Sequence, residues 1–336
     1  MKNFLVTGGA GFIGSNFINY ILSKRNDFKI INLDKLTYAG NLQNLSGVEN
    51  HPNYIFIKGD IVNEELVRNI FERYQINYVI NFAAESHVDR SILSSEIFYR
   101  TNVIGTNVLL ENAKKYGVEK FIQISTDEVY GSLGPEGKFE ETDPLKPNSP
   151  YAASKAAADL MALAYHHTFK VPVIITRCSN NYGPYQFPEK LIPLMIINSI
   201  NNKKLPVYGD GLNVRDWIFV MDHCKAIELV LEKGKTGETY NIGADNEKKN
   251  IDVVKLILNE LGKSENLIEF VKDRPGHDRR YAINSDKIKY ELGWKTDHSF
   301  EDAIHRTIEW YIENEKWWNE IISGDYKNYY ELQYSM

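Results

Sequence analysis

The chain has 336 residues, of which 43% are hydrophobic and 25% charged, with a formal net charge of −6. This composition is that of an ordinary globular protein with core enough for one large domain or two unequal ones. The acidic balance argues against nucleic acid as a partner, because phosphate binding needs clustered positive charge.

The sequence carries no membrane, disulfide or metal signal. We find no signal-peptide core at the start and no run of about 18 apolar residues, so we expect a cytoplasmic protein without a membrane partner. Cys178 and Cys224 are too few for a disulfide framework, and neither the cysteines nor the histidines are clustered as zinc ligands are. We expect reduced, buried cysteines and no metal.

The first predicted element is an apolar strand over residues 4–7, which leads into a glycine turn. Gly8, Gly11 and Gly14 stand three apart between this strand and a predicted helix over 12–24. A side chain at Gly8 or Gly11 would obstruct the turn and the approach of a pyrophosphate, and Gly14 lets the helix pack on the strand. Spaced glycines also occur by chance in loops, so this turn needs support from its context.

The second predicted strand supplies that context. It covers 30–33 and ends at Asp34, 20 residues beyond Gly14, where a carboxylate would accept hydrogen bonds from the adenosine ribose hydroxyls. The 2′-phosphate of NADP would meet a like charge there, which favours NAD, although Lys35 beside it weakens the preference.

Strands and helices continue to alternate through the first half of the chain. The predicted strands cover 4–7, 30–33, 54–57, 78–82, 121–125 and 173–176, and the helices between them cover 12–24, 63–74, 94–116 and 150–169. Repeated βαβ order predicts an α/β fold, a Rossmann-type doubly wound parallel sheet covered by helices on both faces. Ligands of such sheets bind outside the carboxyl ends of the strands.

The pattern changes after Arg177. A helical stretch near 189–201 and loops rich in Gly, Asp and Arg indicate a smaller, interleaved C-terminal substrate-binding domain, while 217–233 is predicted to return to the sheet domain as a helix and 238–242 as a strand. The predicted NAD-binding domain comprises 1–178 with a returning segment of about 213–243. The substrate domain comprises 179–212 and 244–336, with a helical tail.

Tyr151 and Lys155 open the predicted helix over 150–169, and their spacing of four places them on one face. Beside an ammonium group and a cationic nicotinamide, the pKa of the phenol is expected to fall, so that Tyr151 would act as a base toward a sugar hydroxyl. Such a pair is common on any helix. Its place after the glycine turn and after a strand ending in Ser125 and Thr126 favours the catalytic interpretation.

Together these features resemble the extended short-chain dehydrogenase/reductase family, over nearly the whole chain. The resemblance is carried by the glycine turn, Asp34, Asp60, the Tyr151 and Lys155 pair and the motif at 180–184. The longer strings at 34–42, 84–91, 125–131 and 273–281 are similar to those of the NAD-dependent sugar-nucleotide dehydratases. The resemblance implies a tightly bound NAD+ regenerated in each cycle, dTDP-glucose as substrate, and a homodimer formed through the helices over 94–116 and 150–169.

The adjacent Asp127 and Glu128 distinguish a dehydratase from an epimerase. An epimerase returns the hydride to C4, whereas a dehydratase must also remove the C5 proton and protonate the departing C6 hydroxyl, which needs a base and an acid close together. A bare Asp-Glu pair is more often a solvated loop, but this one lies between a buried strand and the Tyr151 helix. The resemblance implies Tyr151 as base on the C4 hydroxyl, Glu128 as base at C5, Asp127 as acid at C6, and Thr126 as a hydrogen-bond partner of the C4 oxygen.

The resemblance also implies two sets of binding residues. Those for the cofactor are Gly8, Gly11, Phe12, Ile13, Gly14, Asp34, Lys35, Leu36, Thr37, Asp60, Ile61, Phe82, Ala83, Ala84, Ser86, Thr101, Tyr151, Lys155 and Asn181. Those for the sugar nucleotide are Ser86, His87, Thr126, Asn180, Glu189, Lys190, Leu191, Pro206, Tyr208, Arg215, Asn250, Arg274, His277 and Tyr281. Among the latter, the basic side chains are expected around the pyrophosphate, which guanidinium groups bind well.

The activity implied is conversion of dTDP-glucose to the 4-keto-6-deoxy sugar nucleotide plus water, which supplies deoxysugar and most commonly rhamnose synthesis. Two alternatives stay open. One is a dehydratase, epimerase or decarboxylase for another nucleotide sugar, and the other is a catalytically silent NAD-binding regulator. The acid and base residues argue against the regulator, which would have no use for them.

Overall fold

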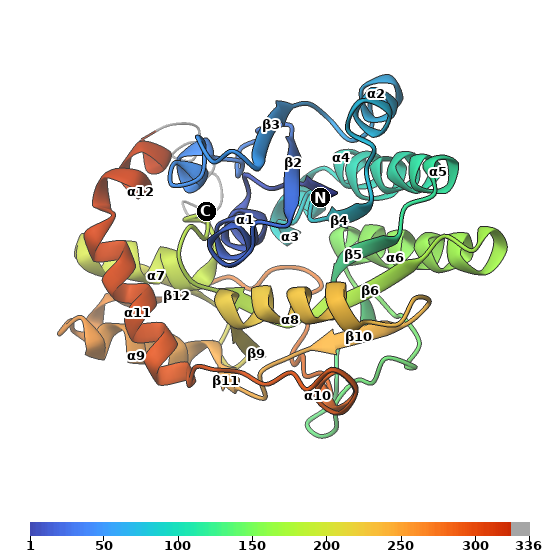
Figure 1. The fold of residues 1–336 in the computed structure, drawn as a ribbon. Helices are drawn as coiled ribbons and strands as arrows, with labels where there is room; N and C mark the ends of the chain where they lie inside the picture. The colour runs from blue at the N-terminus through green and yellow to red at the C-terminus, as the bar shows by residue number, and fades with distance from the viewer. Residues whose placement is uncertain (324–336) are drawn as a thin grey trace.

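A seven-stranded parallel sheet runs through the centre of the computed structural model, which describes residues 1–323 (Figure 1). The last residues assigned to the substrate domain, 324–336, lie outside the described residues. The strand order is β10-β6-β5-β4-β1-β2-β3. The strands are β1 (Lys2–Thr7), β2 (Phe28–Asp34), β3 (Tyr54–Lys58), β4 (Tyr78–Asn81), β5 (Lys120–Thr126), β6 (Val173–Cys178) and β10 (Thr239–Ile242).

Helices cover both faces of this sheet. α1 (Phe12–Lys24) and α8 (Val220–Lys233) pack side by side on one face, and α2 (Glu64–Tyr74), α5 (Thr106–Tyr116) and α6 (Pro150–Phe169) cover the other (Figure 1). Alternate strand residues point to opposite faces, so Ile30 belongs to the first core and Ile31 to the second. This confirms the predicted Rossmann-type doubly wound sheet.

The predicted helix over 94–116 is interrupted. It consists of α4 (Glu96–Phe98), a π-helical turn, η2 (Tyr99–Gly105), and then α5, and it is preceded by α3 (Val88–Leu93). At the end of this wider turn the backbone packs tightly against Ile61: a Cβ at Gly105 would lie 2.4 Å from Cδ1 of that side chain. π-helical turns are frequent at functional sites, and this one contains Thr101, one of the predicted cofactor-binding residues.

The remaining strands form two small sheets. β7 (Asn180–Tyr182), β9 (Val214–Phe219) and β11 (Glu247–Lys249) make one, and β8 (Leu205–Tyr208) pairs with β12 (Ile268–Val271) in the other. The prediction of a helix over 217–233 is wrong for its first three residues, which belong to β9. Trp217, Ile218 and Phe219 are buried in that strand, and the helix begins at Val220.

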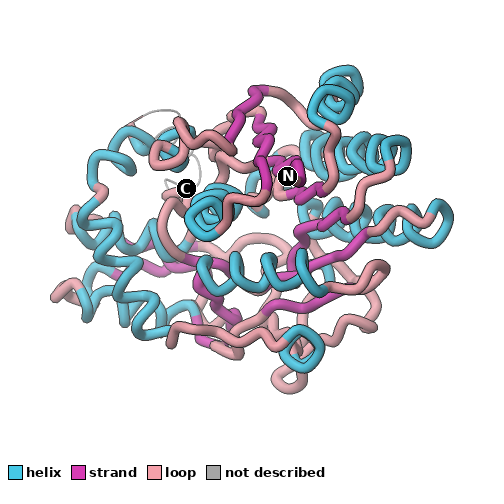
Figure 2. The backbone as a smooth tube through the Cα atoms, viewed as in Figure 1, coloured by secondary structure: helices cyan, strands magenta, loops and turns pink. Residues whose placement is uncertain are grey.

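Helices complete this second part of the molecule. They are α7 (Leu191–Ile200), α9 (Asn250–Glu260), α10 (Asp286–Leu292), α11 (Phe300–Glu313) and α12 (Glu315–Ile322), with a 3-10 turn at Glu265–Leu267 (η4). Two further 3-10 turns follow strands of the central sheet: Leu42–Leu45 (η1) after β2 and Asp127–Tyr130 (η3) after β5. In Figure 2 the strands run through the middle of the molecule, with helices and loops outside them. No helix within residues 1–323 combines the length and apolarity required to cross a bilayer.

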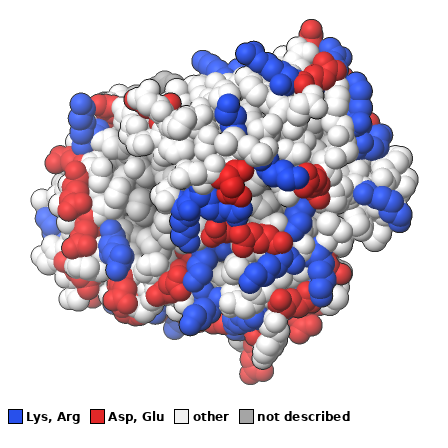
Figure 3. Space-filling view, in the orientation of Figure 1, with Lys and Arg blue, Asp and Glu red and all other residues white. Residues whose placement is uncertain are grey.

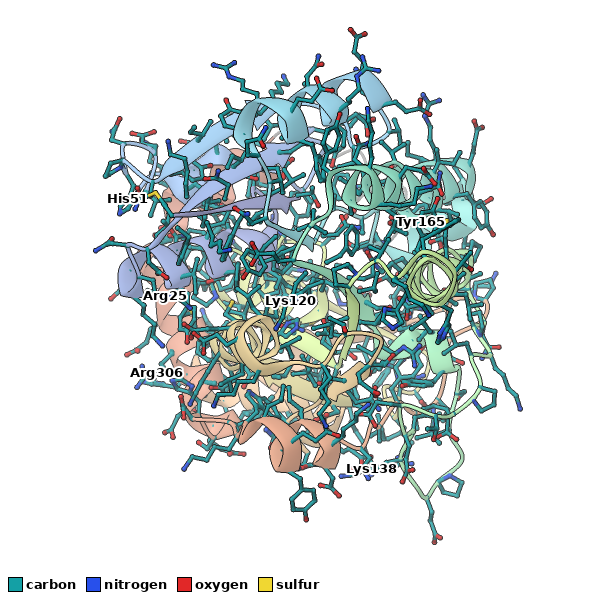
Figure 4. The ribbon with its side chains drawn as sticks, turned by 45° about the vertical axis from the view of Figure 1, so that its right-hand side comes forward. Arg25, His51, Lys120, Lys138, Tyr165 and Arg306 are labelled. Atoms are coloured by element: carbon teal, nitrogen blue, oxygen red, sulfur yellow. The ribbon has the colours of Figure 1, made fainter. Side chains whose placement is uncertain are left out.

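Side chains tie these layers together. Lys120, labelled in Figure 4 at the start of β5, donates to the carbonyl of Leu231 at 2.7 Å, which places its charge at the carboxyl end of α8. Tyr165 on α6 donates to Oδ1 of Asn107 on α5 at 2.9 Å. Acidic and basic side chains are interspersed over the face shown in Figure 3. The site described next therefore rests on tightly connected elements.

Candidate active site

One cavity lies at the carboxyl ends of the central strands. Its wall includes every predicted cofactor residue except Leu36, and it also includes all five predicted catalytic residues. Leu36 instead has a backbone role, since its N–H donates to Oδ1 of Asp34 at 2.7 Å. The sequence thus located the cavity, and the strand ends that form it are those expected for a doubly wound sheet.

The glycine turn forms one end of this cavity. Gly8 has φ +68°, and a Cβ there would lie 2.6 Å from the backbone nitrogen of Ala83. A Cβ at Gly14 would lie 2.4 Å from the carbonyl oxygen of Gly8, so both positions require glycine. At Gly11 the sole atom within 4 Å would be that same oxygen, at 3.3 Å, and the backbone is open toward the cavity. The turn and the first residues of α1 therefore fit a dinucleotide pyrophosphate.

Asp34 ends β2 and is almost fully buried. Its Oδ2 accepts from the backbone N–H of Ala10 at 2.9 Å and its Oδ1 from that of Leu36. Burial raises the pKa of Asp34, and these two hydrogen bonds oppose the rise. Nζ of the adjacent Lys35 lies 2.8 Å from Oδ2 of Asp60, so its charge is already paired. The site accordingly fits a ribose diol better than a 2′-phosphate.

Two local structures bring the catalytic candidates together. Oγ1 of Thr126 accepts from the backbone N–H of Glu128 at 3.3 Å, which starts the turn η3 and places Asp127 and Glu128 directly at the end of β5. Ser149 caps α6 by accepting from the N–H of Ala152, with Pro150 in the first helical turn. Tyr151 and Lys155 on that helix face the same cavity.

The two adjacent carboxyl groups have different surroundings. Asp127 is 2% exposed, and burial followed by the charge of Glu128 raises its pKa well above the usual range. Burial also raises the pKa of Glu128, but Arg274, Arg215 and Lys190 oppose that rise. The surroundings thus favour the neutral acid more strongly at Asp127 than at Glu128, which is the order that a proton donor and a proton acceptor in one site require.

The protein groups around Tyr151 act against the predicted fall in its pKa. Burial and then the charge of Glu128 raise the pKa of the phenol well above its usual value. Nζ of Lys155 donates to the carbonyl of Ile124 at 2.7 Å, and burial lowers the pKa of this ammonium group. The predicted fall assumed a cationic nicotinamide beside the phenol as well as Lys155, so it stays a prediction for the protein with its cofactor bound.

A group of cations adjoins the carboxyl pair. Nζ of Lys190 donates to the carbonyl of Ser86 at 3.1 Å and lines the cavity. Nη1 of Arg274 lies 3.1 Å from Oδ1 of Asp89, while the guanidinium of Arg215 lies 4.3 Å from the ring centroid of Tyr281. All three basic side chains act on Glu128, so they converge on one region. A diphosphate carries the charge that this region would attract.

The remaining predicted substrate residues divide into two sets. Ser86, Thr126, Asn180, Glu189 and Lys190 line the cavity. The following lie outside its lining: His87, Leu191, Pro206, Tyr208, Arg215, Asn250, Arg274, His277 and Tyr281. Several of the latter nevertheless form a connected group, since the hydroxyl of Tyr208 donates to Oδ2 of Asp89 and its ring lies 6.1 Å from that of His277.

The sequence interpretation missed several residues of the cavity wall. Tyr38 and Phe187 line it with their rings 5.4 Å apart, and Glu85 and Gln186 line it as well. Tyr38 and Glu85 belong to strings that carried the resemblance, so that signal was available. Gln186 and Phe187 lie in a loop without a periodic pattern. Within residues 1–323, no three His, Cys, Asp or Glu side chains are grouped to hold a metal ion.

Comparisons with known proteins agree with this geometry. The family model described as GDP-mannose 4,6 dehydratase matches residues 5–307. A dTDP-glucose 4,6-dehydratase of Xanthomonas campestris is 51% identical, covering 97% of this chain and 98% of its own. The solved structure of the Bacillus anthracis dTDP-glucose 4,6-dehydratase in complex with NAD is 55% identical, with a TM-score of 0.90 over 96% of this chain and all of that one. The Streptomyces venezuelae dTDP-glucose 4,6-dehydratase, solved with NAD and a dTDP ligand, is 48% identical, with a TM-score of 0.93 over 95% and 99%.

Proposed function

The chain belongs to the family described as GDP-mannose 4,6 dehydratase, and on that basis we propose that it catalyses the dTDP-glucose 4,6-dehydratase reaction. It is an NAD-dependent hydro-lyase that converts dTDP-glucose to dTDP-4-dehydro-6-deoxyglucose and water. The observation that carries the proposal is the carboxyl pair. Asp127 and Glu128 occupy one strand end, and their surroundings separate an acid from a base.

Each chemical step has a side chain of suitable character. NAD, held in the cavity lined by the glycine turn and Asp34, would supply the hydride acceptor for oxidation at C4 and the hydride donor for reduction at C6. Tyr151 takes the proton of the C4 hydroxyl, and Thr126 donates a hydrogen bond to the C4 oxygen. Glu128 removes the C5 proton, which the C4 ketone has made acidic, and Asp127 gives its proton to the C6 oxygen as water leaves. Glu128 returns the proton to C5 when C6 is reduced. Lys155 holds the nicotinamide ribose.

An epimerase is the nearest alternative chemistry. It needs Tyr151 and the cofactor, but it has no step that uses a buried neutral acid beside a carboxylate. Keeping Asp127 buried next to Glu128 costs free energy, since burial removes the carboxyl group from water and leaves Oδ2 without a hydrogen-bond partner among the described residues. That cost favours the dehydratase.

Assembly, compartment and domain division are also proposed. A homodimer through the helices over 94–116 and 150–169 is supported by large apolar side chains exposed there: Tyr99, Ile104 and Leu160. Two buried free cysteines fit a reducing compartment such as the cytoplasm. The cofactor domain comprises 1–178 with about 213–243, and the sugar-nucleotide domain comprises 179–212 and 244–336.

The activity test uses purified protein without added NAD. It is incubated separately with dTDP-glucose, UDP-glucose and CDP-glucose, and the alkali-sensitive absorbance of the keto product is followed. We expect product from dTDP-glucose at the highest rate. A faster reaction with another nucleotide would reassign the substrate, and no product from any of them after NAD is restored would indicate a silent NAD-binding protein.

A further inference from the structure

The helix that carries Tyr151 and Lys155 holds a third polar residue in the same column. Asp159 follows Lys155 by four residues on α6, so the three side chains lie along one face. Lys155 is 4% exposed and Asp159 is completely buried. The proposed mechanism gives Asp159 no contact with the reacting atoms, and a buried carboxylate in this place requires an explanation.

Lys155 needs a counter-charge. Burial lowers the pKa of its ammonium group, and the two side chains that oppose this are Asp159 first and then Cys178. Burial raises the pKa of the Cys178 thiol to about 12, so this group is neutral near pH 7 and supplies no charge. Glu128 and Asp127, from the end of β5, act on Tyr151 instead. Asp159 is therefore the carboxylate available to Lys155.

Asp159 is itself held by a buried arginine. Oδ2 of Asp159 accepts from Nε of Arg177 on β6 at 2.9 Å, and both side chains are at most 3% exposed. Nη1 of Arg177 donates to the hydroxyl of Tyr130 at 2.8 Å, which in turn donates to Oδ1 of Asn241. Burial raises the pKa of Asp159, and Arg177 and then Lys155 oppose this rise. The network thus holds Asp159 against a buried guanidinium, one helical turn from Lys155.

We propose that Asp159 is a positioning residue of the reaction, which keeps Lys155 protonated so that Lys155 can hold the cofactor ribose and draw the Tyr151 phenol toward ionisation. Arg177 is its partner, because it stabilises the charge of Asp159 in a place where a lone carboxylate would take up a proton. This role rests on the function proposed above. If Asp159 has this role, the reactivity of Tyr151 depends on Asp159, which lies one helical turn beyond Lys155.

The test compares D159N with the double variant D159N/R177Q. In D159N, Lys155 is expected to lose its proton, and the pKa of the Tyr151 phenol then rises. The acid limb of the plot of kcat against pH, which reports ionisation of Tyr151, is expected to move to higher pH. At pH 7, kcat is expected to fall about tenfold or more, since each pKa unit changes the ionised fraction of the phenol tenfold. KM for dTDP-glucose is expected to change less than about twofold, because Asp159 makes no contact with the substrate and its binding interactions are kept. E141Q, which alters a carboxylate at the far end of the same network, is the control and is expected to keep the wild-type profile.

The double variant separates a positioning role from a structural one. D159N leaves a buried arginine unpaired, which destabilises a fold strongly, whereas D159N/R177Q removes both charges. We expect the double variant to regain the wild-type melting temperature and to retain the shifted kcat profile. Recovery of both the wild-type melting temperature and the wild-type kcat profile by the double variant would overturn the proposal. A wild-type kcat profile in folded D159N would overturn it as well.

A second measurement does not depend on turnover. The 13Cε resonance of Lys155 in the wild-type protein, assigned by its loss in K155R, is expected to report a protonated ammonium group throughout pH 6 to about 8. Deprotonation of Lys155 below pH 7 in the wild-type protein would overturn the proposal whether or not the variants fold. Absence of turnover in the wild-type protein would instead refute the proposed function and leave this titration as the test.

Discussion

Replacement of Glu128 by glutamine tests the division of labour between the two carboxyl groups. The amide keeps the volume of the side chain but cannot accept the C5 proton. A general base contributes about 10²- to 10⁴-fold to a rate, which corresponds to about 3–5 kcal/mol in the barrier. Because Lys190, Arg215 and Arg274 act on Glu128, removing its charge strengthens the attraction of these three cations for a diphosphate. E128Q is therefore expected to lose turnover by that factor and to bind dTDP as tightly as the wild-type protein or more tightly.

The assay follows a single turnover of dTDP-glucose by absorbance at 340 nm. If C4 oxidation precedes elimination, E128Q accumulates reduced cofactor that the wild-type protein consumes. E141Q is the matched control, since Glu141 is a half-buried carboxyl group whose pKa burial also raises but which lies outside the cavity. Turnover by E128Q at the wild-type rate would refute the reasoning. Loss of dTDP binding would instead identify Glu128 as a structural residue.

Three further changes probe the cofactor site, the cation group and a buried histidine. D34N is expected to lose NAD during purification, measured by the ratio of absorbance at 260 and 280 nm, because an amide nitrogen cannot accept the bonds that the carboxylate accepts; full NAD content would contradict this. R274Q is expected to weaken dTDP-glucose binding about 10- to 100-fold in calorimetry, because it removes a charged hydrogen bond of about 1.5–3 kcal/mol. R279Q, at an exposed arginine, is the control and is expected to change this affinity less than about twofold. Equal losses of affinity in the two variants would argue against a role of Arg274 in diphosphate binding. Burial lowers the pKa of His223 to about 3 from 6.5, so the unfolded chain takes up this proton first and stability falls as pH drops below 6.5. Between pH 6.5 and 4.5, the free energy of unfolding of H223Q, measured with urea, is expected to fall by about 2–3 kcal/mol less than that of the wild-type protein. An equal fall in the two proteins would refute this.

The sheet and the cofactor end of the site could be read from the sequence because their signals are local. A strand, a glycine turn and a carboxylate 20 residues later occupy one βαβ unit, and Gly14 is required by a backbone contact within it. The βαβ alternation likewise predicted six of the seven strands of the sheet from the first half of the chain, and 238–242 predicted the last.

Features that depend on distant segments were harder to predict. The start of α8 was placed too early because Trp217 and Phe219 have the apolar character of a helix face, while their partner strand β7 lies more than 30 residues away. The fall in the pKa of Tyr151 was predicted from Lys155 and a cationic nicotinamide, without the other protein groups around the phenol. The opposing charge comes from Glu128 on another element, and burial cannot be read from spacing.

The central claim is that one hydride leaves C4 and returns to C6 of the same sugar. The most direct measurement mixes dTDP-[4-²H]glucose with unlabelled dTDP-glucose, treats both with the purified protein, and locates deuterium in the product by mass spectrometry and NMR. The account predicts one deuterium at C6 of the molecules that began with it at C4, and none in the unlabelled pool. Deuterium retained at C4, released to water or found in the unlabelled pool would contradict it.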